Sequence, residues 1–488
     1  MARVLFTHSY FLRLDPKQWR QQQPYAPLGT LQAAAVVREA GFEVALHDVM
    51  FAAGPGDLEP VLRARQPAYL VIYDDGFNYL TKMCLTAMRE AAFQLAALGQ
   101  THGCRVIIAS SDSTDHWAEY LARGADYVLL GEAEITLREL LLALERGHDP
   151  AALPGLARRG ADGAARTTGR RPVLTDLDAL PLPAWDLVDL APYRQAWLQS
   201  TGYFSLNVAT TRGCPYKCNW CAKPIYGNRY HARSPESVVR ELLLLRERFG
   251  LEHVWFCDDI FGLKPGWIDR FAQLVVAHGL RFRFKIQSRA DLLTEPGTAA
   301  GLARAGCETI WLGAESGSQA ILDAMDKGIT VAQIHAATHL IRRHGMRPAF
   351  FLQFGYPGET RADIDATLRM LFDLMPDDIG VSVSYPLPGT GFYEKVRAEL
   401  RGKANWTDSN DLALLFRNTY PPAYYRALHR FVHQRFRRQQ AWQATRTLLA
   451  APRQLTKAGL YQAASVLYHA PATAVAAFRW RQQANASR

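Results

Sequence analysis

The stretch TTRGCPYKCNWC, residues 210–221, gathers three cysteines in one short segment. Cys214, Cys218 and Cys221 follow the spacing C-x3-C-x2-C, and Trp220 directly precedes the last of them. A structural zinc site normally completes its tetrahedron with a fourth Cys or His nearby, and iron–sulfur clusters are usually held by four cysteines. Three thiolates without a fourth ligand therefore indicate an iron–sulfur cluster in which one iron stays open for another molecule.

Two other interpretations of these cysteines stay open. Cysteine is among the most buried residue types, and positions 214, 218 and 221 would share one face of a helix. Gly213 and Pro215 oppose such a helix, and Lys217 and Asn219 favour an exposed loop. A zinc site is the second alternative.

Length and composition predict a globular protein of two or three domains, since the chain has 488 residues, of which 49% are hydrophobic. The other cysteines, at positions 84, 104, 257 and 307, lie in apparent core elements, which favours a reducing compartment over a disulfide framework. The segment after Met1 lacks the layout of a signal peptide, and no apolar run reaches membrane-spanning length. We therefore expect a cytoplasmic protein.

Residues 1–147 alternate apolar strands with helices, which predicts an α/β domain with a parallel, doubly wound sheet of the Rossmann or flavodoxin type. The expected strands are Arg3–Thr7, Phe42–His47, Tyr69–Tyr73, Arg105–Ala109 and Tyr127–Leu130. The expected helices include Leu31–Glu39, Leu80–Leu98 and Ile135–Glu145. Residues 148–200 break the pattern and predict a short hairpin and a Pro-rich linker between domains.

Residues 201–400 resume the alternation and predict six β/α units, too few for a complete eight-unit barrel. The expected strands are Ser205–Thr210, His253–Phe256, Arg283–Gln287, Thr309–Leu312, Ala349–Phe354 and Gly380–Ser384. A partial, open TIM-like barrel leaves a wide lateral mouth for a large substrate. Its active site is expected at the carboxyl ends of the strands.

Residues 401–488 predict a helical and basic extension. After Asp411 there are twelve Lys and Arg residues and no Asp or Glu, and aromatic residues interleave with the basic ones. Such a tail suits a helical cap on the barrel or an anionic membrane surface. It contains no recognisable nucleic-acid module, so nucleic acid is not an expected partner. Membrane contact would place the protein peripherally at the inner membrane surface.

Several segments together resemble one known family. They are PLG (27–29), DLDALPLPAWDL (176–187), the cysteine segment, RSPESVVREL (233–242), FCDDIFG (256–262), LGAESGS (312–318) and PLPGTG (386–391). Over roughly residues 1–400 the chain resembles the radical S-adenosylmethionine (SAM) enzymes that carry an N-terminal cobalamin-binding-type domain. That family includes cobalamin-dependent methylases and the anaerobic magnesium-protoporphyrin IX monomethyl ester cyclase.

The resemblance implies that the three cysteines hold a 4Fe–4S cluster and that SAM binds its open iron. An electron from an external low-potential donor would then cleave SAM to a 5′-deoxyadenosyl radical. Further SAM contacts are expected at the strand ends, from Trp220, Asp258, Asp259, Arg289, Glu315, Ser316 and Gln353. A carboxylate of the Asp pair suits the SAM ammonium, and a guanidinium suits its carboxylate. Taken singly, each has an ordinary alternative, such as a helix cap for the Asp pair or a surface ion pair of Arg289 with Asp291 or Asp258.

The resemblance also implies cobalamin in the first domain. The expected contacts are Asp74, Asp75, Gly76, Ser111, Ser113, Gly131 and Glu132, which follow predicted strands. The chain lacks the D-x-H-x-x-G motif whose His serves as an axial ligand in many cobalamin domains. Ordinary strand-end turns, or a fold that keeps no corrin, stay open as alternatives.

The functional hypothesis that follows is a cobalamin-dependent radical SAM methyltransferase. It would methylate an unactivated carbon of a large substrate, which is a small molecule, a lipid or a peptide. The alternative is an oxidoreductase, cyclase or rearranging enzyme of the same group, because one fold hosts several reactions. A sensor or assembly protein that binds a cluster or corrin without catalysis is a third hypothesis, from another class.

Overall fold

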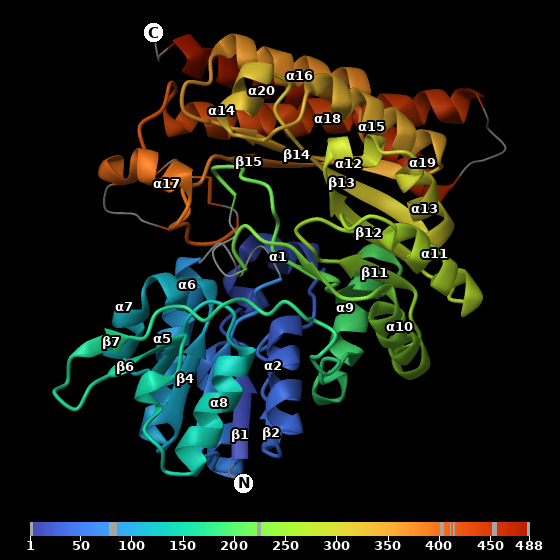
Figure 1. The fold of residues 1–488 in the computed structure, drawn as a ribbon. Helices are drawn as coiled ribbons and strands as arrows, with labels where there is room; N and C mark the ends of the chain where they lie inside the picture. Colours follow the sequence, from blue (N-terminus) through green and yellow to red (C-terminus); the bar gives the residue numbers. More distant parts are fainter. Residues whose placement is uncertain are drawn as a thin grey trace.

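The computed structural model describes residues 3–77, 85–221, 226–400, 405–409, 411–412, 415–450 and 456–485. Two α/β domains lie end to end, as Figure 1 shows: the N-terminal domain in blue and cyan, and a barrel domain in green to orange. Red C-terminal helices cover the barrel domain on the side away from the N-terminal domain.

The N-terminal domain contains a seven-stranded sheet in the order β2-β1-β3-β4-β5-β6-β7. The strands are β1 Arg3–Thr7, β2 Glu43–Leu46, β3 Tyr69–Tyr73, β4 Arg105–Ala109, β5 Tyr127–Leu129, β6 Leu156–Arg159 and β7 Ala165–Thr167. Strands β1 to β5 pair in parallel, which confirms the predicted doubly wound sheet. Its principal helices are α2 Leu28–Glu39, α3 Glu59–Arg65, α5 Thr86–Thr101, α6 Ser111–Asp115, α7 Trp117–Ala122 and α8 Glu134–Glu145.

Two local features differ from the predictions for this domain. The hairpin expected in the linker adds β6 and β7 to the sheet as antiparallel strands, so the sheet extends past residue 147. The predicted cobalamin residues Ser111 and Ser113 lie in α6, at whose start Ser110 and Ser113 form a reciprocal capping box. Of the helix predicted from Leu80, residues 80–84 lie outside the described chain, and α5 runs three residues beyond the predicted end.

The barrel domain is an open six-stranded sheet in the order β15-β14-β13-β12-β11-β8. Its strands are β8 Ser205–Val208, β11 His253–Phe256, β12 Arg283–Ser288, β13 Cys307–Glu315, β14 Arg347–Phe354 and β15 Asp378–Val383. All neighbouring pairs are parallel, which confirms the six predicted strands and the partial barrel. The larger helices around them are α9 Ala191–Thr201, α10 Pro235–Phe249, α11 Trp267–Ala277, α13 Thr298–Ala305, α15 Val331–Arg343 and α16 Arg361–Leu374.

The C-terminal extension forms α18 Pro422–Ala450, α19 Lys457–Ala464 and α20 Val466–Asn485. Tyr424, Tyr425 and Phe436 of α18 are almost fully buried and belong to the same hydrophobic core as the barrel. The extension is therefore a helical cap on the barrel, which was one of the two roles expected from the sequence. No helix in the described ranges combines the length and hydropathy needed to cross a bilayer.

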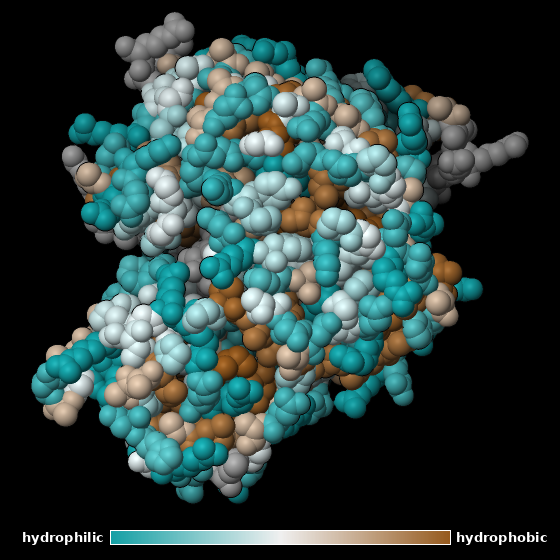
Figure 2. Space-filling view, viewed as in Figure 1, coloured by the Kyte–Doolittle hydropathy of each residue, from teal (hydrophilic) through white to brown (hydrophobic). Residues whose placement is uncertain are grey.

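The surface of the molecule is predominantly hydrophilic on the face seen in Figure 2. Hydrophobic residues gather in patches near the middle of this face, where the linker passes between the two domains. Beneath the linker, Trp185 is 1% exposed, and its Nε1 donates to Glu241 of α10 at 2.9 Å. The linker is thus packed between the domains.

Candidate functional site

The cysteine segment leaves the barrel directly after β8, and Asp258 on the adjacent strand end holds its start. The Asp258 carboxylate accepts hydrogen bonds from Thr210 N (2.7 Å), Thr211 N (2.8 Å) and Thr210 Oγ1 (2.5 Å). Burial raises the pKa of Asp258 to about 6, although these hydrogen bonds act in the opposite direction. Asp258 therefore anchors the segment, and its contact with the SAM ammonium stays a prediction, as does that of the half-buried Asp259.

The backbone before the first cysteine makes a turn that only glycine fits. Strand β9, Thr211–Arg212, pairs antiparallel with β10, His231–Ala232. Gly213 then adopts a φ of +77°, and a Cβ at this position would collide with the carbonyl oxygen of Arg229. The order Gly-Cys in the motif is thus a backbone requirement of the site.

The three cysteines lie on a loop that Asn219 fastens to the rest of the barrel. Cys214 is buried, Cys218 and Cys221 are half-buried, and none of the three forms a disulfide. Asn219 Nδ2 donates to Asp326 Oδ2 at 2.7 Å, and its Oδ1 accepts a hydrogen bond from the Tyr356 hydroxyl at 2.8 Å. Neither partner was expected from the sequence, because both lie more than 100 residues away along the chain.

Two buried cations adjoin Cys218. Arg289 Nη1 lies 4.0 Å from Cys218 Sγ, and its guanidinium stacks over the ring of Tyr216 at 3.6 Å. Arg289 also forms an ion pair with Asp291 at 3.0 Å, which is the partner that the alternative interpretation named. Arg289 is only 4% exposed, however, so this is not a surface ion pair. Burial disfavours the charge of Lys327, yet the Glu315 carboxylate and the Cys218 thiol outweigh this effect and raise the pKa of Lys327.

The remaining predicted SAM residues lie at the carboxyl ends of β13 and β14. Glu315 has a left-handed φ of +56° and forms an ion pair with Lys327 at 2.8 Å. The Ser316 hydroxyl bonds Thr367 Oγ1 at 3.0 Å, and Gln353 Nε2 donates to Ser384 Oγ at 2.9 Å. Glu315 and Trp220 thus meet around Lys327, whose Nζ lies 5.7 Å from the Trp220 ring. The contacts of all these residues with SAM remain predictions.

The chemistry of this loop fits an iron–sulfur cluster. Neighbouring cations favour thiolates, which are the ligating form, and the buried Trp220 Nε1 has no hydrogen-bond partner within the described chain. Among the described residues, no group of three or more His, Cys, Asp and Glu side chains is arranged to hold a single metal ion. Three cysteines that bind three different irons need not converge in that way.

A second candidate site is a hollow of about 300 Å³ at the carboxyl ends of β3, β4 and β5. Four of the predicted cobalamin residues line it: Asp74, Gly76, Gly131 and Glu132. Asp74 accepts hydrogen bonds from Ser9 N at 2.7 Å and Ser9 Oγ at 2.8 Å, and burial raises the pKa of Asp74. The other wall belongs to Tyr226 of the barrel domain.

The other predicted cobalamin residues stabilise the loops of this hollow. Asp75 Oδ1 accepts hydrogen bonds from Gly29 N and Phe77 N, and Ser113 belongs to the capping box of α6, whose first residue is Ser111. Carboxylates, hydroxyls and glycine backbone suit the amide groups that rim a corrin. The segments 78–84 and 222–225, adjacent in sequence to Phe77 and Tyr226, lie outside the described chain.

Arg212 joins this hollow to the cysteine segment. Its guanidinium, two residues before Cys214, pairs with both Glu132 and Glu134 of the N-terminal domain, the latter at 2.8 Å. The Phe77 and Tyr226 rings lie 5.7 and 5.5 Å from the guanidinium. This ion-pair triad, Arg212–Glu132–Glu134, was not expected from the sequence, because its members lie about 80 positions apart.

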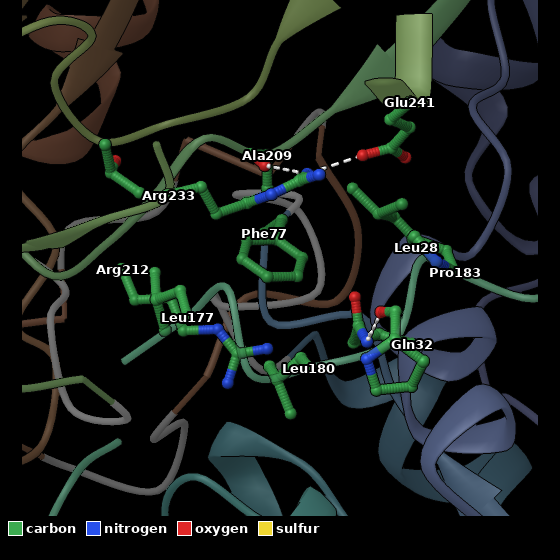
Figure 3. A pocket seen from close by; sticks show the side chains of 12 residues that line it. Leu28, Gln32, Phe77, Leu177, Leu180, Pro183, Ala209, Arg212, Arg233 and Glu241 are labelled. Carbon is green, nitrogen blue, oxygen red and sulfur yellow. Dashed lines mark hydrogen bonds and ion pairs between the residues drawn. The ribbon is translucent and has the colours of Figure 1, made fainter. Parts of the chain in front are cut away.

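Phe77 lines a further hollow, of about 410 Å³ (Figure 3). Leu177 and Leu180 of the linker form apolar walls, and Arg212 and Arg233 line its edge. Arg233 donates to Glu241 at 2.5 Å and to the Ala209 carbonyl at 3.0 Å. Both arginines are therefore already neutralised by carboxylates.

The fold and the site define a class of protein: an open β/α barrel with a three-cysteine cofactor loop, joined to a Rossmann-like domain whose strand ends contact the same loop. Residues 208–371 match the radical SAM superfamily. This match lies in the barrel domain and contains the three cysteines, in agreement with the resemblance seen in the motifs.

Three curated relatives and one solved structure illustrate the similarity. An uncharacterized methyltransferase of Pyrococcus horikoshii is 30% identical over 55% of this chain, and the match spans 57% of that relative. The anaerobic magnesium-protoporphyrin IX monomethyl ester cyclase of a Synechocystis species is 26% identical over 77% of this chain and 73% of its own. The hopanoid C-3 methylase of Methylococcus capsulatus is 23% identical over 90% of this chain and 80% of its own.

The solved structure is the radical SAM methyltransferase TsrM from Kitasatospora setae with cobalamin and a [4Fe-4S] cluster bound. It superposes with a TM-score of 0.66 at 22% identity, covering 81% of this chain and 78% of that chain. At this identity the comparison shows a shared fold, including both domains.

Proposed function

We propose that this radical SAM protein is a methyltransferase that uses a 4Fe–4S cluster, SAM and cobalamin to methylate an unactivated carbon. The observation that carries the proposal is the Arg212 triad, which joins the cysteine loop to the strand ends where a Rossmann-like domain binds its ligand. Relatives named as methyltransferases and a structural neighbour with cobalamin and cluster bound support it.

Each residue group has a separate task in this proposal. Cys214, Cys218 and Cys221 would hold the cluster, which when reduced would supply the electron for SAM cleavage, and cobalamin at the strand ends of the first domain would supply a carrier for the methyl group. Arg289 and Lys327 balance the negative charge of the thiolates and offer donors to the SAM carboxylate. Trp220 and the rings of Tyr216 and Tyr226 exclude water.

The substrate in this proposal is large, and a lipid is its best-supported class. The barrel is an open sheet with edge strands β8 and β15, which leaves one side without strands. A hopanoid methylase is among the relatives, and its match spans 90% of this chain. A large polycyclic lipid or a tetrapyrrole therefore suits the site better than a peptide. Electrons would come from an external low-potential donor, and the protein would work at the periphery of a membrane.

Anaerobic reconstitution tests the proposal. We expect four irons, four sulfides and one corrin per chain. Under a strong reductant, S-adenosylhomocysteine and 5′-deoxyadenosine should both form from SAM. Cys218→Ala should abolish both products, whereas Cys104→Ala, in the buried core of the first domain, should retain the iron. Zinc in place of iron, or unchanged SAM cleavage in Cys218→Ala, would refute the proposal. Deoxyadenosine without S-adenosylhomocysteine would instead identify an oxidoreductase, cyclase or rearranging enzyme.

A further inference from the structure

The C-terminal helices carry most of the exposed large hydrophobic side chains in the described chain. Twelve such side chains are at least 37% exposed, and eight of them lie between residues 442 and 478. They are Trp442, Leu449, Leu460, Tyr461, Leu467, Tyr468, Val475 and Phe478. Isolated exposed apolar residues are ordinary, but a concentration of this kind marks an interaction surface.

Helix α20 has two apolar faces, and only one of them is covered. Ala476 and Trp480 are buried against α18, where Trp480 stacks on Phe431 at 4.9 Å. At 3.6 residues per turn, Leu467, Tyr468, Val475 and Phe478 fall within an arc of about 100° on the opposite side. These four side chains are 50–80% exposed, so most of the stripe faces solvent.

The basic residues beside this stripe favour an anionic partner over a second copy of the chain. Arg446, Lys457, Arg479 and Arg481 are exposed, and none of them has an acidic partner within 4 Å in the described chain. Beyond Asp411 the sequence contains no acidic residue. A two-fold contact with a second copy would place the same basic residues against each other, because both copies present the same patch. An anionic surface would instead be attracted.

We propose that the stripe of α20, together with α19 and the end of α18, binds an anionic lipid bilayer. Leucine and phenylalanine would enter the interfacial region, tyrosine and tryptophan suit the boundary between lipid and water, and the basic residues suit the headgroups. The helices lie on the side of the barrel away from the N-terminal domain, so bilayer contact leaves the interdomain hollows accessible (Figure 1). The inference deepens the proposed function by naming a partner, and it is tested without turnover.

Flotation of the full chain with vesicles tests it. We expect binding to vesicles of equal parts phosphatidylglycerol and phosphatidylcholine, and much weaker binding to phosphatidylcholine alone. Arg479→Glu combined with Arg481→Glu should weaken binding by about tenfold or more, since each basic residue near anionic lipid contributes appreciably. Leu467→Ser combined with Phe478→Ser should weaken it similarly. All four positions are exposed, so the thermal unfolding temperature should not change.

Two matched controls lie on the barrel. Val276 is 67% exposed on α11, close to the 66% of Phe478, and Arg281 is exposed at the same end of that helix. Val276→Ser and Arg281→Glu should bind vesicles like the unsubstituted chain. Equal binding by the α20 variants and these controls would overturn the proposal, as would absence of flotation. A dimer that Leu467→Ser with Phe478→Ser converts to monomers, without lipid binding, would identify self-association instead and also overturn it. None of these outcomes depends on SAM cleavage or methyl transfer.

Discussion

Replacement of Arg212 by Met is the sharpest test of how the two domains are joined. The guanidinium is 6% exposed and balances two carboxylates, of which Glu134 is also almost fully buried. Burial already raises the pKa of Glu132, while the Arg212 charge opposes that rise. Methionine keeps much of the volume but leaves both carboxylates without a counter-ion. Breaking a buried pair in this way costs about 3–5 kcal/mol of unfolding free energy.

The assay is guanidinium-induced unfolding of the apoprotein, with a double-mutant cycle through Glu134→Gln. We expect Arg212→Met to lower the unfolding free energy by about 4 kcal/mol, and the coupling energy with Glu134→Gln to exceed about 1.5 kcal/mol. Arg233→Met is the matched control, because the Arg233–Glu241 pair is also buried but lies within the barrel domain. It should destabilise without coupling to Glu134.

Loss of the Arg212 charge should also affect the cysteine loop locally. Arg212 lies two residues before Cys214, so Arg212→Met should lower the iron content after reconstitution more than Arg233→Met does. A loss below about 1 kcal/mol, or a coupling energy below about 0.5 kcal/mol, would show that the triad does not hold the domains together.

Three further predictions concern single residues of the barrel. Burial raises the pKa of Glu359 from 4.5 to about 8, so the free energy of unfolding should fall by about 5 kcal/mol in total as pH rises through this window. In urea unfolding between pH 6 and 8.5, Glu359→Gln should remove this pH dependence. Equal pH dependence in both proteins would contradict the prediction. Lys327→Met removes a cation from beside Cys218 and leaves Glu315 buried without its partner. The affinity for SAM should therefore drop at least tenfold in equilibrium dialysis. Lys395 is exposed, so Lys395→Met should bind SAM as the unsubstituted chain does. Gly213→Ala should prevent iron uptake, while Gly279→Ala, also at positive φ but with open space around it, should not; full iron content in Gly213→Ala would disprove the turn requirement.

Much of the fold was predictable because local patterns encode it. Each barrel strand is an apolar run between amphipathic helices, and the six predicted strands agree with the structure to within a few residues, except that Cys307–Glu315 extends two residues before and three beyond the predicted Thr309–Leu312. The hairpin Leu156–Arg159 and Ala165–Thr167 was predicted as a hairpin, yet nothing local showed that it joins the first sheet. Sheet membership is a long-range property that strand propensity does not carry.

In the candidate site too, local features could be predicted from the sequence and long-range contacts could not. The cysteines were evident because their spacing is local, whereas the partners that orient them are not. Lys327 reaches Glu315 from 12 positions away, and Arg212 reaches Glu132 across 80. An isolated lysine or arginine in a sequence gives no sign of being buried, since most are exposed. One signal was available: a buried strand-end carboxylate such as Glu132 requires a counter-ion, and Arg212 is the basic residue that precedes the motif.

The arrangement of charges indicates which side of the site is already set before ligands bind. Arg289 is held by Asp291 and by the carbonyls of Lys327 and Gly328, and Lys327 is held by Glu315. Both cations therefore keep their positions beside Cys218 without any ligand, which is the preorganisation that favours charge stabilisation at little reorganisation cost. The hollow of the first domain is different, because it lies between two domains: Tyr226 of the barrel domain lines it together with the strand ends of the first sheet. A movement of these walls on binding of a corrin would reach the cysteine loop through contacts between the domains, among them the triad at Arg212.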